Sequence, residues 1–336
     1  MSTTVLRPAD LRELIARALV ASHTSEANAR SVARALTQAE IDGQKGHGLS
    51  RTLSYAAQVK VGKVDGRAVP EVKQTRPASL VVDVKYGFAF PALDMALERL
   101  PALARAAGIA AAAFTRSHHI GAAGRVVEGL AEQGLVGLLV SNTPKAMASW
   151  GGRCPAFGTN PIAFAAPQRG NPPVVVDLAL SQVARGKILT AAQKGEEIPP
   201  GWAFARDGRP TTDAKAALEG TLAPLGGAKG SALAFMVEVM AAALTGANFA
   251  FEASSFLDDK GGPPGVGQLL LGIDPDAFTG TDAFLDRCAA LAAAIESDPG
   301  TRLPGSRRLM LREKAAREGV GVDSELLEEV RRLAGA

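Results

Sequence analysis

The sequence predicts a mixed α/β protein whose two ends are helical. Apolar residues recur at helical spacing between residues 8 and 56, and again from residue 282 onward. Between these segments, short apolar runs alternate with turns and helical stretches, which is typical of strands connected by helices. The 336 residues, 47% of them hydrophobic, are enough for two domains. We therefore expect the helical ends to pack together as one domain beside an α/β middle.

Three helices are predicted near the N-terminus from apolar spacing and capping residues. The first covers residues 8–22. The second begins after a cap at Thr24 or Ser25 and ends at Gly43. A short third helix is expected around Tyr55.

The middle of the chain combines predicted strands with helices. Residues 109–115 are apolar and lead through a helix into a second strand at 135–141, which predicts a βαβ-like unit. A helix over residues 88–107 is expected to be interrupted at Pro101. The other predicted strands cover residues 80–84, 174–178 and 268–273.

The second half of the chain holds a predicted flap and the most apolar helix. Residues 199–213 are rich in Pro, Gly and Asp and should form a loop or flap. Residues 232–244 form a helix whose only charge is Glu238, so we expect this helix to be buried. The C-terminal helices are predicted over residues 282–297, 313–318 and 324–333.

Composition argues against several classes of protein. The net charge is only +3 and the basic residues are scattered, which argues against a nucleic-acid partner. Cys154 and Cys288 lie far apart without ligand-like spacing, so no metal site is expected. The N-terminal residues do not resemble a signal peptide, and no apolar run reaches the roughly 20 residues of a membrane span. We therefore predict a cytoplasmic protein with no membrane partner.

The segment from Gly46 to Arg51 carries the clearest chemical signal. His47 can hold or release a proton near neutral pH, and Arg51 can grip a carboxylate with two parallel hydrogen bonds. A proton donor beside a carboxylate anchor suits chemistry at the carbon next to a carboxylate. The alternative interpretation of these six residues is a surface loop in which the histidine and the arginine are only solvated.

Three further segments could bind an anion. His118 and His119 end a predicted strand before a Gly-Ala-Ala-Gly turn, although paired histidines are also common in packing roles. Lys229 lies between small residues at a helix start, and Arg307 and Arg308 follow a Pro-Gly turn. The chain has neither a G-x-G-x-x-G nor a P-loop motif. These features favour redox or proton-transfer chemistry on a small anionic molecule.

Seven motifs in order resemble the type-2 malate/L-lactate dehydrogenase family, over about residues 5–320. This family includes malate, lactate, sulfolactate and ureidoglycolate dehydrogenases, and reductases of the cyclic imines Δ1-piperideine-2-carboxylate and Δ1-pyrroline-2-carboxylate. The motifs are Gly46–Arg51, Ser117–Gly121, Phe157–Pro161, Asp177–Ala179, Ala184–Lys187, Gly227–Gly230 and Pro304–Arg308.

The resemblance implies a particular fold and cofactor. It implies a non-Rossmann nicotinamide-binding domain with a mostly antiparallel sheet, a helical domain formed by both termini, and NAD or NADP as cofactor. It also implies a homodimer acting on a small anionic substrate. The corresponding domain ranges are 1–75 and 297–336 for the two parts of the helical domain, and 76–296 for the nicotinamide and substrate domain.

The resemblance also implies roles for individual residues. His47 would be the proton donor, with His119 as the alternative, and Arg51 would anchor the substrate carboxylate, while Thr159 and Arg185 would face the substrate. The residues implied to hold the cofactor are His119, Ile120, Gly121, Ala122, Ala123, Asp177, Leu178, Ala179, Ala228, Lys229, Pro304, Gly305, Ser306, Arg307 and Arg308.

Two departures from the imine-reductase pattern bear on the substrate. Gly46 stands where those enzymes have a serine, and Lys187, a candidate catalytic residue, stands where they have an aspartate. We therefore favour hydride transfer between a nicotinamide and C2 of a 2-oxo or 2-hydroxy acid of the malate, lactate or sulfolactate type. The alternative is a Δ1-pyrroline-2-carboxylate or Δ1-piperideine-2-carboxylate reductase that forms L-proline or L-pipecolate. A more remote alternative is a module that binds a nucleotide or organic acid without turnover.

Overall fold

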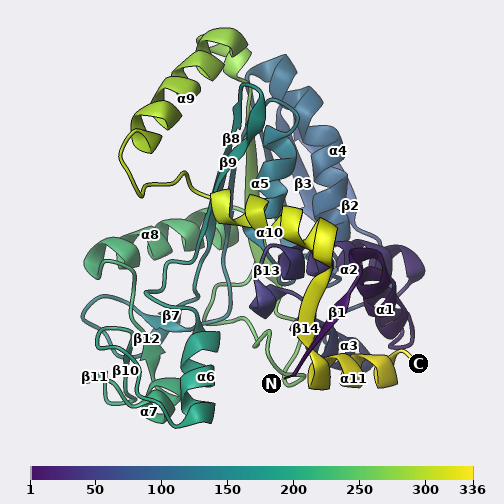
Figure 1. Ribbon diagram of the computed structural model, residues 1–336, viewed down its shortest axis with the longest axis vertical. Helices are drawn as coiled ribbons and strands as arrows, with labels where there is room; N and C mark the ends of the chain where they lie inside the picture. Colours follow the sequence, from purple (N-terminus) through teal and green to yellow (C-terminus); the bar gives the residue numbers. More distant parts are fainter. Residues whose placement is uncertain (1, 336) are drawn as a thin grey trace.

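The computed structural model describes residues 2–335, and in it the two ends of the chain form one helical unit (Figure 1). A strand at each end pairs antiparallel with the other, and the helices beside them share one hydrophobic core. The expected packing of the two termini is therefore confirmed, while the domain boundaries at residues 75 and 297 stay predictions. The elements of this unit are β1 (Thr3–Leu6), α1 (Pro8–Val20), α2 (Glu26–Ile41), η1 (Lys45–His47), α3 (Ser50–Lys60), α10 (Ser306–Glu318), β14 (Val320–Asp323) and α11 (Ser324–Leu333).

A seven-stranded sheet forms the centre of the described chain, with strand order β2-β3-β4-β13-β5-β8-β9. Only the β3–β4 pair is parallel, so the mostly antiparallel sheet that the resemblance implied is confirmed. The strands are β2 (Glu71–Arg76), β3 (Ser79–Asp83), β4 (Ile109–Ser117), β5 (Val136–Ser141), β8 (Ile162–Gln168), β9 (Asn171–Leu178) and β13 (Val266–Ile273).

The two faces of this sheet are covered by different helices, because alternate side chains of a strand point to opposite faces. Ala112 and Phe114 of β4 pack against α4 (Ala89–Ala107) and α5 (Ala123–Ala131). Their neighbours Ala111 and Ala113 pack on the core that includes α8 (Ala228–Glu238) and η2 (Val239–Ala243). Both faces of the sheet are therefore buried.

The predicted βαβ-like unit at residues 109–141 is only partly correct. β4 and β5 run in the same direction, since both are antiparallel to β13, but they are not neighbours. β13 lies between them and comes from more than a hundred residues later in the chain. A local pattern contains no information about such an inserted strand.

A smaller lobe carries the segment predicted as a flap. Its five-stranded sheet has the order β11-β10-β12-β6-β7, and the helices α6 (Arg185–Lys194) and α7 (Ala214–Glu219) pack beside it. The prediction of a loop or flap for residues 199–213 is partly correct, because within it only Ala203–Phe204 and Pro210–Thr211 form strands, as a short hairpin of this sheet. Its strands are β6 (Met147–Ala148), β7 (Pro155–Phe157), β10 (Ala203–Phe204), β11 (Pro210–Thr211) and β12 (Thr221–Leu222).

Two helix predictions are wrong. α4 continues through Pro101, because Leu100 and Ala104 on either side are fully buried in the sheet core and hold both halves in line. The apolar helix at residues 228–243 is not buried on all sides, and Phe235 is 61% exposed. The remaining elements are η3 (Pro275–Ala277) and α9 (Thr281–Glu296), which projects at the top of Figure 1.

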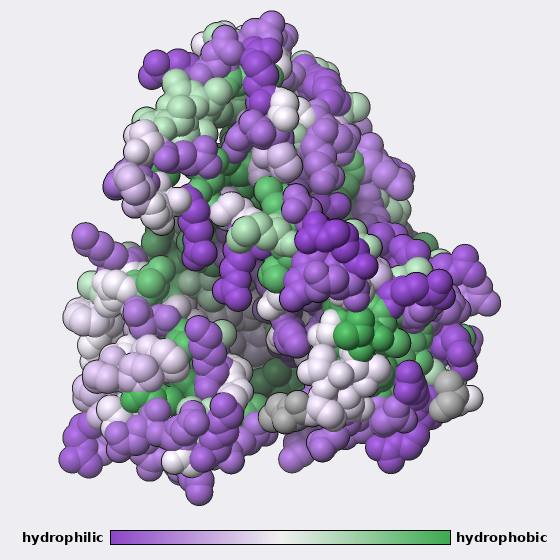
Figure 2. Space-filling model, in the orientation of Figure 1, coloured by the Kyte–Doolittle hydropathy of each residue, from purple (hydrophilic) through white to green (hydrophobic). Residues whose placement is uncertain are grey.

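The lobes leave a depression in the molecular surface. Figure 2 shows one face, hollowed between the lobe of α6 and α7 and the helical unit that carries α11. None of the helices in the described part of the chain combines the length and apolar character needed to cross a bilayer.

Candidate active site

His47 ends the short turn η1, and the glycine after it allows a close contact. The carboxylate of Glu40, near the end of α2, accepts the backbone N–H of Leu49 at 2.9 Å. A Cβ atom on Gly48 would lie 2.0 Å from Oε2 of Glu40, so a larger residue would displace this carboxylate. Gly48 therefore lets Glu40 fix the start of α3 directly after His47.

Arg51 lies in the first turn of α3, and its side chain is anchored at one end only. Nε donates to the carbonyl oxygen of Gly46 at 2.7 Å. Within residues 2–335, no hydrogen bond is found from either terminal nitrogen of Arg51. These two nitrogens can therefore bind a carboxylate in the two-point arrangement that guanidinium groups favour.

The histidines of the two predicted motifs lie against each other. The rings of His47 and His119 are stacked, with centroids 5.1 Å apart and an interplanar angle of 15°. Tyr55 Oη lies 2.6 Å from His119 Nδ1, and Phe256 packs beside His119. The structure thus joins segments that are about seventy residues apart in the sequence.

His118 has a different environment from its neighbour. Its side chain is buried, and its Nε2 atom lies 3.0 Å from Oε1 of Gln58. The amide nitrogen of Gln58 donates to the carbonyl oxygens of Phe256 and Asp258. His118 therefore helps to hold the loop around Phe256 against α3.

Burial and positive charge keep all three histidines neutral. Burial, followed by the charge of Arg51, lowers the pKa of His47 to about 4, while Asp177 acts in the opposite direction. Burial, Arg51 and Lys63 lower the pKa of His118 to about 3. Burial and Arg51 also place the pKa of His119 well below its ordinary value. The site therefore combines uncharged imidazole rings with the positive charge of Arg51, which has no ion-pair partner within residues 2–335.

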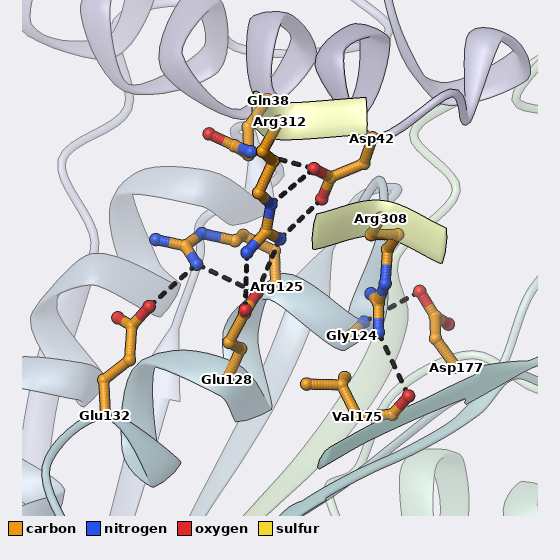
Figure 3. A network of polar contacts seen from close by, with 10 residues as sticks. All are labelled: Gln38, Asp42, Gly124, Arg125, Glu128, Glu132, Val175, Asp177, Arg308 and Arg312. Atoms are coloured by element: carbon orange, nitrogen blue, oxygen red, sulfur yellow. Dashed lines mark hydrogen bonds and ion pairs between the residues drawn. The ribbon is translucent and has the colours of Figure 1, made fainter. Parts of the chain in front are cut away.

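A second group of polar side chains lies next to this site, at the end of β9 (Figure 3). Asp177 accepts hydrogen bonds from the Gln44 side chain at 3.1 Å and from the Gly124 backbone at 2.9 Å. Arg308 donates to the carbonyl oxygen of Val175, but its buried Nη1 has no partner in the described chain. An anion would supply the acceptor that this nitrogen lacks.

Three other predicted site residues, Thr159, Arg185 and Lys187, lie on other segments of the chain. Arg185 begins α6 and donates to the carbonyl oxygen of Leu218, and Lys187 is exposed on that helix. Thr159 contacts Thr143 within the chain segments between β5 and β8. No hydrogen bond among residues 2–335 joins these three to His47 or Arg51.

The remaining cofactor candidates fall on loops and helix starts. Ile120, Gly121 and Ala122 lead into α5, which begins at Ala123, while Leu178 ends β9 and Ala179 follows it. Ala228 and Lys229 are exposed in the first turn of α8. Pro304 and Gly305 precede α10, which begins with Ser306, Arg307 and Arg308.

Sequence reasoning missed Tyr55, Glu40 and Gln44 as site residues. Tyr55 follows Arg51 by four residues, so both lie on one face of α3, and this spacing was a usable signal. Glu40 and Gln44 act through contacts with residues that only the folded chain brings near. Within residues 2–335, no group of three or more His, Cys, Asp or Glu side chains could hold a metal ion.

The chain is similar over its whole length to characterised enzymes. The model of the malate/L-lactate dehydrogenase family matches residues 6–331. A (2R)-3-sulfolactate dehydrogenase (NADP(+)) of Chromohalobacter salexigens is 46% identical over 98% of each chain. A Δ1-pyrroline-2-carboxylate/Δ1-piperideine-2-carboxylate reductase of Pseudomonas putida is 43% identical, over 99% of this chain and 98% of its own. The crystal structure of the Δ1-piperideine-2-carboxylate reductase of Pseudomonas syringae superposes with a TM-score of 0.93 at 40% identity, covering 98% of this chain and 100% of that one.

The neutral histidines of the site should make the folded state less stable in acid. Because their pKa values are lowered on folding, the unfolded chain binds more protons than the folded chain between about pH 6.5 and 4. The free energy of unfolding should therefore fall as the pH falls through this window, by up to about 1.4 kcal/mol per pH unit for each histidine. Urea unfolding at a series of pH values measures this slope.

Two variants separate these histidines from other titrating groups. His47→Asn should make the slope shallower, and His23→Gln, which removes an exposed histidine outside the site, should leave it unchanged. A slope that is the same in wild type and His47→Asn would contradict the neutral state of His47.

Proposed function

Because the chain belongs to the malate/L-lactate dehydrogenase family, we propose that it is a nicotinamide-dependent oxidoreductase that acts at C2 of a small 2-oxo or 2-hydroxy acid. Sulfopyruvate and (2R)-3-sulfolactate are the favoured pair. The observation that carries this proposal is the arrangement of His47, stacked on His119, and Arg51, whose terminal nitrogens have no hydrogen-bond partner within residues 2–335.

Arg51 is proposed to bind the substrate carboxylate and thereby to place C2 next to His47. Binding of a carboxylate would offset the charge that lowers the pKa of His47, so the imidazole would gain a proton more easily with substrate in place. Asp177 raises the same pKa. His47 would then hold its proton where negative charge grows on the substrate oxygen during reduction.

The side chains around Asp177 and Arg308 fit a nicotinamide dinucleotide. Arg308 offers a buried, unpartnered nitrogen to an anionic group such as a phosphate. A Cβ atom on Gly124 would lie 2.6 Å from that nitrogen, so the glycine leaves it room. When bound, the cofactor supplies or accepts the hydride. We propose NADP, because the C. salexigens relative is named an NADP(+)-dependent enzyme. We also propose that the predicted segments around residues 119–123, 177–179, 228–229 and 304–308 hold it.

The nature of the substrate depends on the charges near C2. Arg185 and Lys187 are cations on α6 that would suit the second anionic group of sulfopyruvate, and Gly46 lacks the hydroxyl expected in an imine reductase. Thr159 is proposed to line the same side of the substrate. One observation favours the alternative, reduction of a cyclic imine, because the Asp177 carboxylate near His47 would stabilise a protonated imine.

The exposed apolar side of α8 supports the proposed homodimer. Leu233, Phe235 and Met236 are exposed on a helix that carries only apolar and small residues between Lys229 and Glu238. A water-exposed patch of this kind is typical of surfaces that pair with another chain. The cytoplasmic location predicted from the sequence stays a prediction.

The purified chain should oxidise NADPH when sulfopyruvate, oxaloacetate or pyruvate is added. We expect kcat/KM for the preferred 2-oxo acid to exceed that for Δ1-pyrroline-2-carboxylate, because cations on α6 favour a developing oxyanion over an iminium ion. Loss of NADPH absorbance across this panel, repeated with NADH, measures both preferences. A ratio that favours the imine by about tenfold or more would assign the imine-reductase function instead, and no turnover of any substrate would remove the enzyme proposal.

Arg51→Lys should raise KM for the acid by about tenfold or more. Lysine keeps the positive charge but loses the two parallel hydrogen bonds to the carboxylate. Steady-state kinetics at saturating NADPH measures the change, and Arg116→Lys, at a surface ion pair with Asp83, serves as the matched control. An unchanged KM in Arg51→Lys would place the carboxylate elsewhere.

A further inference from the structure

Tyr55 is a buried residue of α3 that contacts the site through one atom. Its ring is fully buried and packs against Phe88, Phe90 and His118. Its hydroxyl oxygen lies 2.6 Å from Nδ1 of His119. Among residues 2–335, no other hydrogen bond involves this hydroxyl. The phenol and the imidazole are therefore each other's partners.

The direction of this hydrogen bond follows from what each arrangement leaves unpaired. If Nδ1 of His119 carried the hydrogen, the phenol would accept it and its own buried hydrogen would have no acceptor. An unsatisfied buried donor costs about 1–3 kcal/mol. If the phenol donates, both atoms are satisfied, and the single hydrogen of neutral His119 must then lie on Nε2.

The Nε2 atom of His119 is free to meet a ligand. Nδ1 of His47 and Nδ1 of His118 are buried and have no hydrogen-bond partner among the described residues, but Nε2 of His119 remains accessible to solvent. No residue in the described part of the chain accepts a hydrogen bond from it. A neutral His119 with its hydrogen on Nε2 therefore offers one N–H donor to whatever binds beside His47.

We propose that Tyr55 is a positioning residue that donates its hydrogen to Nδ1 of His119 and holds this histidine as the neutral tautomer with the hydrogen on Nε2. The catalytic role of this contact rests on the proposed function, whereas the tautomer of His119 does not depend on it. His119 then orients the bound molecule through its N–H group. His47 remains the residue that gains and loses the proton.

The stacked geometry opposes protonation of both imidazoles at the same time. The rings of His47 and His119 lie too close for two positive charges, and Arg51 and His118 also face His119. Protonation of His119 at Nδ1 would force the phenol to accept and would leave its hydrogen unpaired. Tyr55 thus opposes a charge on His119 and leaves the proton to His47.

The tautomer can be measured without turnover. In protein labelled with nitrogen-15 at histidine, proton–nitrogen correlation spectra at neutral pH distinguish a nitrogen that carries hydrogen from one that does not. We expect Nδ1 of wild-type His119 to lack hydrogen and Nε2 to carry it. Tyr55→Phe keeps the ring but removes the donor, and should release His119 into a mixture of tautomers.

The chain offers a matched control, because its only other tyrosine is Tyr86. Tyr86 is partly exposed and stacks on Arg116 outside the site, so Tyr86→Phe should leave the His119 signals and the kinetics unchanged. In Tyr55→Phe, kcat should fall by about tenfold, as expected for one lost hydrogen bond, while KM for the acid changes little because Arg51 is intact.

Several results would overturn the proposal. A wild-type His119 with its hydrogen on Nδ1 would do so even if Tyr55→Phe failed to fold. An unaltered His119 tautomer in folded Tyr55→Phe would also do so, as would a kcat equal to that of wild type. If the tautomer shifts as expected but no substrate is ever turned over, the proposed function fails and the positioning role of Tyr55 stands.

Discussion

The guanidinium group of Arg312 connects the helices that lead to the His47 turn, to His119 and to Arg308. It lies 2.7 Å from Asp42 at the end of α2 and 2.6 Å from Glu128 on α5, and both carboxylates are almost fully buried. Burial works against the charge of Arg312, but these two partners outweigh it and raise its pKa. Buried carboxylates left without such a partner are strongly unfavourable. The bridge (Figure 3) therefore fixes α10, α2 and α5 relative to one another.

Each of these helices leads directly to a site segment. α2 continues into the turn that carries His47, α5 begins next to His119, and α10 carries Arg308 one turn before Arg312. The contact between Gln44 and Asp177 adds a second link between the catalytic turn and the end of β9. One ion-pair network thus sets the distance between the proposed proton donor and the proposed cofactor segment. The same burial removes water from the histidines, so the charge of a bound acid would be weakly screened at His47.

The sequence predicted those features that depend on near neighbours. The helix that begins at Pro8 and the strand that ends at Leu178 follow from local spacing. The second helix was predicted to be capped by Thr24 or Ser25, and Ser25 is the cap. The separation of His47 and Arg51 in the sequence already suggested that they act together. The insertion of β13 between β4 and β5, the contact of Tyr55 with His119 and the bridge at Arg312 join distant segments, so no local pattern contained them. The burial expected for α8 was wrong, because apolar composition alone does not determine which sides of a helix the rest of the chain covers.

The central claim is that the turn of His47 and Arg51 and the segment around Arg308 serve one reaction at C2 of a small acid. Isotope transfer tests this claim most directly. NADPH carrying deuterium at the transferable position would be incubated with the purified chain and sulfopyruvate, and the product examined by mass spectrometry and proton NMR. The account predicts sulfolactate with one deuterium at C2. Sulfolactate without deuterium at C2, or unchanged sulfopyruvate and cofactor from every acid and imine tried, would contradict it.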